Sequence, residues 1–366
     1  MSLLVKRGIV ATTPGHEPAR WPADRPFPRV TISDRTTEPL FRGERAWESL
    51  FLGWVRVLKI GGTWHMWYTS LDRKARSDFD SMLCYATSSD GIHWTRPDLC
   101  LILYAGSRQN NIILLNNTGA SVCLDPAAPP HERFKLLTTR QIREGAWEQW
   151  VWGASSPDGI SWTWNEQPLM KANSDTDNVM IRDGDVYRLY CRMWTGGSIL
   201  KGHRVIGYTE SRTFGSFPAP RQILGPDAQD PPDLHFYNSA VTKICDGLYV
   251  MFPAGFYTGS QMIRSHLAFS RDGKAWDRAG REPLLDVGQG FDSRSIYVAP
   301  GAISAGTPGE YWFYYRGHNF PHDGQNDRIT DPGGFGRFKV TLTPGMTAST
   351  RRSCWTTGSA ATARKS

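Results

Sequence analysis

Acidic side chains recur along this chain where short polar segments adjoin apolar, β-rich runs. Five of them are candidates for chemistry: Glu48, Asp125, Asp175, Asp177 and Asp292. Two carboxyl groups held at a fixed separation can protonate a leaving oxygen and activate water or attack directly, which is what cleavage of a glycosidic bond requires. The question is therefore which elements could bring such distant acids together.

Each acid also has a structural interpretation that the sequence leaves open. Glu48 can be a solvated loop acid, and Asp125 before Pro126 suits an ordinary turn. Asp175 and Asp177 are two residues apart, so they share one face of an extended chain. We expect Asp175 to face a site, with Asp177 as its alternate, although either could simply cap the entry to a strand.

A repeated motif, Ser-x-Asp-Gly-x-x-Trp, indicates the elements that position these acids. It occurs at residues 88–94, 156–162 and 270–276, with a degenerate copy near Ser211. Each copy follows an alternating β-rich run, so the Asp-Gly pair predicts a hairpin turn. We therefore expect Asp90, Asp158 and Asp272 to be structural, and the following Trp residues to pack against the next strand.

The copies lie roughly 50 to 70 residues apart, and five units of that size account for about 300 residues. No segment has the pattern of an amphipathic helix of three turns. The sequence thus predicts an all-β fold, a five-bladed β-propeller of four-stranded antiparallel blades, with another all-β arrangement as the alternative. Residues 1–45 would form an arm able to add a closing strand, residues 46–345 the propeller, and residues 346–366 a disordered basic tail.

Composition excludes several other classes. The net charge is +7, but four basic residues lie in the last sixteen positions, which leaves about +3 for the rest, and no nucleic-acid-binding module is evident. Neither a signal peptide nor 18 consecutive apolar residues is present, so we expect a cytoplasmic protein without a membrane partner. The six cysteines form no C-x-x-C pair, which argues against a zinc site and fits reduced thiols.

Over about residues 40 to 345 the chain resembles the five-bladed propeller glycoside hydrolases, which include β-fructosidases, arabinanases, β-xylosidases and neoagarobiose hydrolases. The resemblance rests on the three hairpin motifs, the Met66-Trp67-Tyr68 strand, the Asp125-Pro126 pair and the stretch from Tyr314 to His318. The Asn-Asp-Pro-Asn-Gly signature of the β-fructosidases and a clear Glu-Cys pair are absent, so the substrate stays open.

The resemblance implies roles for particular residues. Glu48 holds the place of the first catalytic carboxylate, as base or nucleophile, and Asp175 that of the acid or of a pKa-modulating carboxylate. Asp125 matches an Asp-Pro element that steadies the transition state, and Asp292 would be a further carboxylate of the site. His318 matches a late-blade histidine that serves as general acid, or it binds a hydroxyl or a loop carbonyl.

Sugar rings stack on aromatic faces, while their hydroxyls require polar partners. The candidate substrate-binding residues are Trp47, Arg192, Trp194, Tyr237, Asn238 and Arg294. We expect a carbohydrate substrate and no cofactor, with a calcium or other divalent ion in the central channel as an open alternative. The sequence does not address the oligomeric state.

The sequence therefore predicts a hydrolase of an O-glycosidic bond in a small oligosaccharide or at a terminal sugar. One alternative is an inverting phosphorylase of the same fold, in which Arg294, Arg316 and His318 would bind phosphate. The other is a non-catalytic propeller that binds a glycan or a protein.

Overall fold

The computed structural model describes Trp21 and residues 26–175, 177–197, 199, 201–323 and 329–343. The predicted tail at 346–366 and most of the first 25 residues of the predicted arm lie outside these ranges. No helix in the described part is long and apolar enough to cross a membrane.

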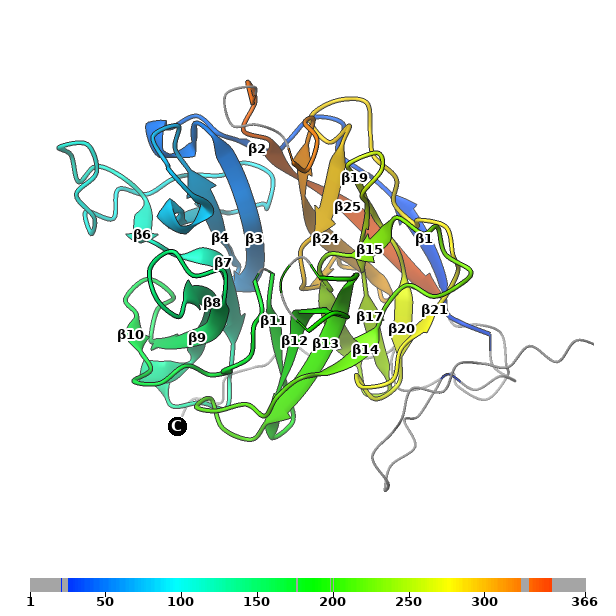
Figure 1. Ribbon diagram of the computed structural model, residues 1–366. Helices are drawn as coiled ribbons and strands as arrows, with labels where there is room; N and C mark the ends of the chain where they lie inside the picture. Colours follow the sequence, from blue (N-terminus) through cyan, green and yellow to red (C-terminus); the bar gives the residue numbers. More distant parts are fainter. Residues whose placement is uncertain are drawn as a thin grey trace, which may run out of the picture.

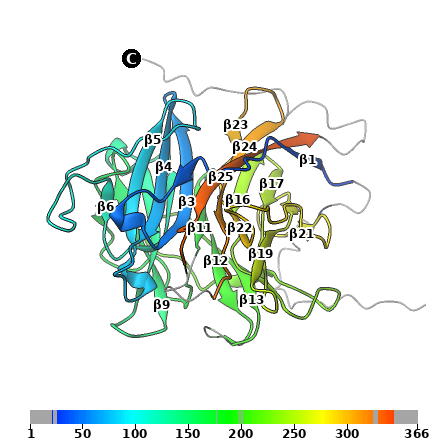
Figure 2. The same cartoon turned by 90° about the horizontal axis from the view of Figure 1, so that it is seen from above.

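Four separate four-stranded antiparallel sheets are arranged around a common centre (Figures 1 and 2). In three of them the strands follow one another in chain order, as in a meander. Their strands are β3 (Phe51–Ile60), β4 (Thr63–Leu71), β5 (Met82–Ser88) and β6 (Ile112–Leu114); β7 (Thr118–Leu124), β8 (Phe134–Gln141), β9 (Gln149–Ser156) and β10 (Thr163–Trp164); β11 (Val179–Asp183), β12 (Val186–Trp194), β13 (Arg204–Ser211) and β14 (Arg221–Leu224). The fourth sheet contains β16 (Val241–Cys245), β17 (Leu248–Met251), β20 (Ala268–Ser270) and β21 (Asp277–Arg278).

The remaining strands form one nine-stranded sheet. Its main path contains β1 (Arg29–Ser33), β25 (Gly334–Thr343), β24 (Glu310–His318), β22 (Ser295–Val298), β19 (Met262–Ser265), β18 (Ala254–Tyr257) and β15 (Leu234–Phe236), in that order. Two short strands, β2 (Phe41–Arg42) and β23 (Ile303–Ser304), pair with β25 and β24. Three 3-10 helices complete the elements, η1 (Ala46–Glu48), η2 (Asp78–Asp80) and η3 (Pro130–Glu132).

The all-β propeller with four-stranded antiparallel blades is confirmed, but the structure has four such blades rather than the predicted five. The fifth expected unit is part of the larger sheet, because β19 pairs in parallel with β22 at Ile263 and Ser295. Strands β18 and β19 form an extra hairpin inserted between β17 and β20, after Pro253. The turn motifs and β-rich runs in the sequence did not predict this insertion.

The two ends of the described chain meet in the nine-stranded sheet. β1 pairs antiparallel with β25 over five residues, from Arg29 opposite Thr343 to Ser33 opposite Lys339. This pairing joins the first strand to the last and so closes the ring, which leaves fewer unpaired strand edges.

The repeated motif forms hairpin turns, as predicted. In the first copy the Ser88 Oγ accepts a hydrogen bond from the Gly91 amide at 2.8 Å, while Asp90 Oδ1 accepts from the amides of Ile92 and His93. The second and third copies repeat these contacts. The aspartates are therefore occupied by their own turns, which confirms their structural role.

Each turn also joins its sheet to a neighbouring one. The carbonyl oxygen of Gly159 accepts a hydrogen bond from the Trp67 indole at 2.7 Å, and that of Gly273 accepts from the Tyr190 hydroxyl at 2.8 Å. Gly159 has φ of 79°, and a Cβ there would lie 2.6 Å from the Trp67 ring. Glycine is thus required both by the turn and by the close approach of the next sheet.

Apolar side chains fill the spaces between adjacent sheets. One cluster joins Trp67 and Tyr85 of the first sheet to Phe134 and Leu136 of the second. Among the described cysteines, Cys84, Cys100, Cys123 and Cys191 are free thiols, but Cys245 is disulfide-bonded, so the expectation of reduced thiols is wrong for that residue.

Candidate functional site

The innermost strands β3, β7 and β11 meet at a buried arginine. Arg56, in the middle of β3, donates from Nε to Ser121 Oγ of β7 at 2.9 Å, and its Nη2 lies 3.3 Å from both carboxylate oxygens of Asp177. Asp177 lies two residues before the start of β11, so this contact lies at the end of the central channel where β11 begins. Three sheets thus converge on one ion pair.

Asp177 is almost fully enclosed, with 2% of its surface exposed. Burial raises its pKa above the usual range, and the positive charges of Arg56 and Arg316 only partly offset this effect. A carboxyl group whose protonated form is favoured by burial is suited to donate a proton.

Asp175 lies beside the same site and contacts a second buried arginine. Its Oδ2 is 3.0 Å from Arg192 Nη1, whereas its buried Oδ1 has no hydrogen-bond partner among the described residues. Arg192 also donates from Nε to the Tyr237 carbonyl at 2.6 Å and lies 3.7 Å over the Tyr237 ring. The predicted residues Asp175, Arg192 and Tyr237 are therefore in contact.

The end of β24 contributes Arg316 and His318. The Arg316 guanidinium lies 3.7 Å from the Tyr297 ring centroid and 4.1 Å from that of Trp54. His318 Nε2 is 3.0 Å from the Leu52 carbonyl oxygen. Burial and the nearby Arg316 charge hold the pKa of His318 well below its usual range, which favours the neutral imidazole. Its predicted role as general acid or hydroxyl ligand stays a prediction.

Two asparagines at the starts of innermost strands leave their side chains unsatisfied. Asn117 precedes β7 and Asn238 lies shortly before β16; both are buried, and both side-chain atoms of each have no partner in the described structure. Trp194, at the end of β12, packs under the Arg204 guanidinium at 4.4 Å. Buried amides without partners are unusual and suit the hydroxyls of a sugar.

Asp78 joins this site from the loop between β4 and β5. Thr118 at the start of β7 donates its hydroxyl to the Asp78 carbonyl at 2.7 Å. The Asp78 side chain is exposed to solvent, yet desolvation by the surrounding protein raises its pKa, with Arg316 opposing. Asp78 therefore lies close enough to Arg316 for the two charges to interact.

Glu48 does not join the cluster. It is fully buried, accepts the Tyr68 hydroxyl at 2.5 Å and Arg96 Nε at 2.8 Å on Oε1, and accepts the Glu44 and Arg45 amides on Oε2. Because both oxygens are occupied, this environment is that of a structural carboxylate.

Two further predicted acids are held elsewhere. Asp292 is 2.5 Å from Arg35 Nη2 and accepts the Tyr315 hydroxyl at 2.9 Å. Asp125 follows the last residue of β7, so it lies at the opposite end of the channel from Asp177, where it contacts Tyr187. Asp125 therefore lies away from the channel end where Asp175 and Asp177 meet, and the Asp292 carboxylate is held by Arg35 and Tyr315.

The last two predicted binding residues differ in their position relative to the cluster. Trp47 donates from its indole to Asn111 at 3.0 Å and packs on Tyr104, away from the arginines. Arg294 lies next to the site through its backbone, which donates to the His318 carbonyl at 2.9 Å.

Several residues of the site were not predicted from the sequence. These are Arg56, Asp78, Asn117, Arg204, Tyr297 and His322, whose ring centroid lies 4.7 Å from that of Tyr237. Arg56 carried a signal, since a charged residue within the apolar run Val55-Arg56-Val57 of an innermost strand can only face the channel or a partner. Asp78, in the short 3-10 helix η2, offered none.

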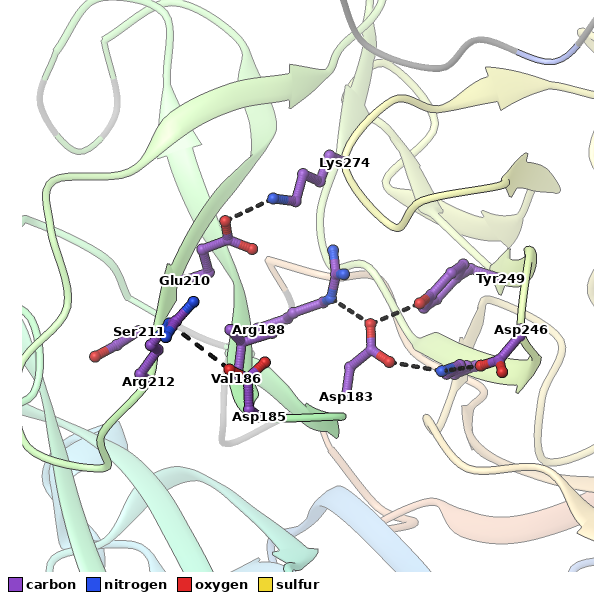
Figure 3. A pocket seen from close by; sticks show the side chains of 11 residues that line it. Asp183, Asp185, Val186, Arg188, Glu210, Ser211, Arg212, Asp246, Tyr249 and Lys274 are labelled. Carbon is purple, nitrogen blue, oxygen red and sulfur yellow. Dashed lines mark hydrogen bonds and ion pairs between the residues drawn. The ribbon is translucent and has the colours of Figure 1, made fainter. Parts of the chain in front are cut away.

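A hollow of about 600 Å³ lies at the other end of the same strands (Figure 3). Asp183, the last residue of β11, accepts hydrogen bonds there from Lys243 and Tyr249, both at 2.6 Å, and pairs with Arg188 Nε at 2.6 Å. Lys274 pairs with Glu210 at 2.6 Å. These charges satisfy one another between two sheets, so the hollow shows the features of an interface rather than of a catalytic site.

Within the described ranges, no group of three or more His, Cys, Asp or Glu residues is arranged to hold a metal ion. The ion that the sequence left open in the central channel therefore stays a prediction.

No protein family model matches the sequence, and no curated protein does. Solved structures are similar in fold. An N-acetylgalactosamine deacetylase from F. plautii aligns with a TM-score of 0.58 at 14% identity over 84% of this chain and 95% of the other. A member of the GH130 family of mannoside phosphorylases, which contains hydrolases of β-1,2 mannosidic linkages, aligns with a TM-score of 0.57 at 13% identity over 88% and 96%.

A family 117 glycoside hydrolase from Zobellia galactanivorans aligns with a TM-score of 0.53 at 13% identity, covering 88% of this chain and 92% of the other. The resemblance to the propeller glycoside hydrolases is therefore confirmed at the level of fold. Because one similar structure is a deacetylase, the likeness of fold does not by itself select a reaction.

Proposed function

We propose that this protein is a glycoside hydrolase that cleaves an O-glycosidic bond of a small oligosaccharide or a terminal sugar. The observation that carries the proposal is the meeting of Asp175 and Asp177 with aromatic rings and unsatisfied amides at one end of the channel. Enzymes of this reaction require two carboxyl groups and polar partners for sugar hydroxyls.

Asp177 is the proposed proton donor, since burial raises its pKa. Asp175 is the proposed base or nucleophile, because Arg192 holds one of its oxygens while the other has no partner in the described structure. Asp78 is the third candidate acid, exposed and with its pKa raised. We assign no catalytic role to Glu48, whose oxygens are both occupied.

Tyr237, Trp194 and Trp54 are the proposed walls of the sugar site, and Asn117 and Asn238 the proposed partners of hydroxyl groups. Stacking of sugar faces on aromatic rings combined with a few directed hydrogen bonds is the usual design of such pockets.

The test is incubation of the purified protein with a panel of aryl glycosides and oligosaccharides, with and without inorganic phosphate. We expect phosphate-independent release of sugar, and NMR of the first product formed gives its anomeric configuration. Glycan binding without turnover on any substrate would replace this proposal with a non-catalytic propeller, and cleavage only with phosphate would replace it with a phosphorylase.

A further inference from the structure

Four arginines gather around the channel end described above. They come from different strands: Arg56 from β3, Arg192 from β12, Arg204 from β13 and Arg316 from β24. Arg56 pairs with Asp177 and Arg192 pairs with Asp175. Neither Arg204 nor Arg316 forms an ion pair within the described ranges, and Arg316 is only 3% exposed.

Aromatic rings lie against the two guanidinium groups that have no ion pair. Arg316 lies 3.7 Å from the Tyr297 ring centroid and 4.1 Å from that of Trp54, and Arg204 lies over Trp194 at 4.4 Å. The Nε and Nη1 atoms of Arg316 and the Nε of Arg204 are buried without a hydrogen-bond partner in the described structure. Stacking fixes the plane of a guanidinium group and leaves the N–H donors at its edge free to bind a planar acceptor such as a carboxylate.

Only two of the four guanidinium groups have a paired carboxylate. Arg316 and Arg204 lie near Asp78 and the exposed Asp323 but form no ion pair with them within the described ranges. The nearby His322 adds no charge at neutral pH. Burial and the charges of Arg204, Arg192 and Arg316 lower the pKa of His322 to about 3. A buried cation without a partner is costly, and an anion that enters the site would remove this cost.

We propose that this cluster recognises an oxyanion carried by the substrate, namely the carboxylate of an acidic sugar residue, with Arg316 and Arg204 as its binding groups. The inference rests on the proposed function, since it names the substrate class of the same site. Charge-assisted hydrogen bonds from arginine to a carboxylate are among the strong polar contacts of proteins. The same donors could hold inorganic phosphate, so the test separates the two sources.

The experiment compares matched sugars by isothermal titration calorimetry at pH 7 and low salt. Oligosaccharides of galacturonic acid are titrated against the corresponding galactose oligosaccharides, glucuronides against glucosides, and inorganic phosphate alone. We expect at least one acidic sugar to bind at least about 10-fold more tightly than its neutral counterpart, a difference of about 1.4 kcal/mol in binding free energy.

The variants Arg316→Met and Arg204→Met should each remove most of this preference, about a 10-fold loss, while neutral sugars change little. Arg204 is less enclosed than Arg316, so its variant serves if Arg316→Met does not fold. The matched control is Arg337→Met, because Arg337 stacks on Trp312 at 4.0 Å on β25, outside the cluster. It should bind both kinds of sugar as the unaltered protein does.

Equal binding of acidic and neutral sugars, or a preference that survives both Arg316→Met and Arg204→Met, would overturn the inference. Phosphate binding that depends on these arginines, with no preference for acidic sugars, would overturn it as well. Cleavage of neutral glycosides alone would leave the hydrolase proposal standing without an anion site. Arginine-dependent binding of acidic sugars without any cleavage would leave the anion site standing and contradict the hydrolase proposal.

Discussion

An aspartate lies at each end of β11, and the two differ in whether the charges around them are paired. At its last residue, Asp183 is bound by Arg188 of its own sheet and by Lys243 and Tyr249 of the neighbouring sheet (Figure 3). Before its first residue, Asp177 shares its site with Arg316, whose Nε and Nη1 atoms have no hydrogen-bond partner in the described structure. Charges that satisfy one another stabilise a fold, whereas charges left incomplete in a buried site are available to a ligand.

The largest expected effect separates these two aspartates. Asp177→Asn should lower glycoside turnover by about 10³-fold, because it removes the proposed proton donor. Asp183→Asn should leave turnover per folded molecule unchanged and lower the free energy of unfolding by about 3 kcal/mol, since Arg188 and Lys243 lose their partner. Initial rates and urea denaturation measure both, and equal rates for the two variants would remove the distinction between the two ends.

Glu48 extends the comparison to a buried acid outside both regions. Glu48→Gln should lower the free energy of unfolding by about 3 kcal/mol, because the charge of Arg96, which is 9% exposed, loses its partner. The control is Glu38→Gln on the exposed pair with Arg42, where a change within about 0.5 kcal/mol is expected. A large loss of turnover at normal stability would instead restore Glu48 as a catalytic carboxylate.

The channel end also responds to pH, because His322 lies there and no histidine lines the hollow of Figure 3. The folded pKa of His322, about 3, lies below its ordinary 6.5, so folding favours the neutral ring. Its stabilising contribution is present above pH 6.5 and is lost as the pH falls toward 3. Between pH 6.5 and 4.5 the unaltered protein should lose about 2 kcal/mol more than His322→Gln, measured by urea denaturation; parallel losses would contradict the assignment.

The smallest effect concerns the repeated turn. Asp158→Ala should lower the free energy of unfolding by about 1 kcal/mol, because two backbone amides lose their acceptor. Asp185→Ala, at an exposed and distant ion pair, should change it by less than about 0.5 kcal/mol. Thermal unfolding distinguishes the two, and a loss of turnover with Asp158→Ala at full stability would give the turn a chemical role.

Local chemistry made much of the fold predictable. The Asp-Gly turns and their flanking strands depend on neighbours within a few residues, and the β-rich run before the first turn is indeed a strand, β5 (Met82–Ser88). The pairing of β19 with β22 joins hairpins far apart in the chain, and no local pattern encodes it. That pairing is why the fifth expected blade is part of a larger sheet.

The site was predictable to the extent that position in the repeat determines it. Asp175 and Asp177 were identified because they precede an innermost strand, and the structure joins them to Arg192 and Arg56. Glu48 holds a similar position in the chain, but its carboxylate turns to Arg96, which lies 48 residues later. The direction of a side chain depends on such distant partners, which spacing alone does not reveal.

The most direct test of the account is hydrogen exchange measured by mass spectrometry with and without a glycan that the protein binds. The account predicts slower exchange in peptides that contain residues 177–181, 235–239 and 316–318, with no change in peptides that contain residues 183–188 and 243–249. Protection confined to the second set, around the hollow of Figure 3, would contradict it.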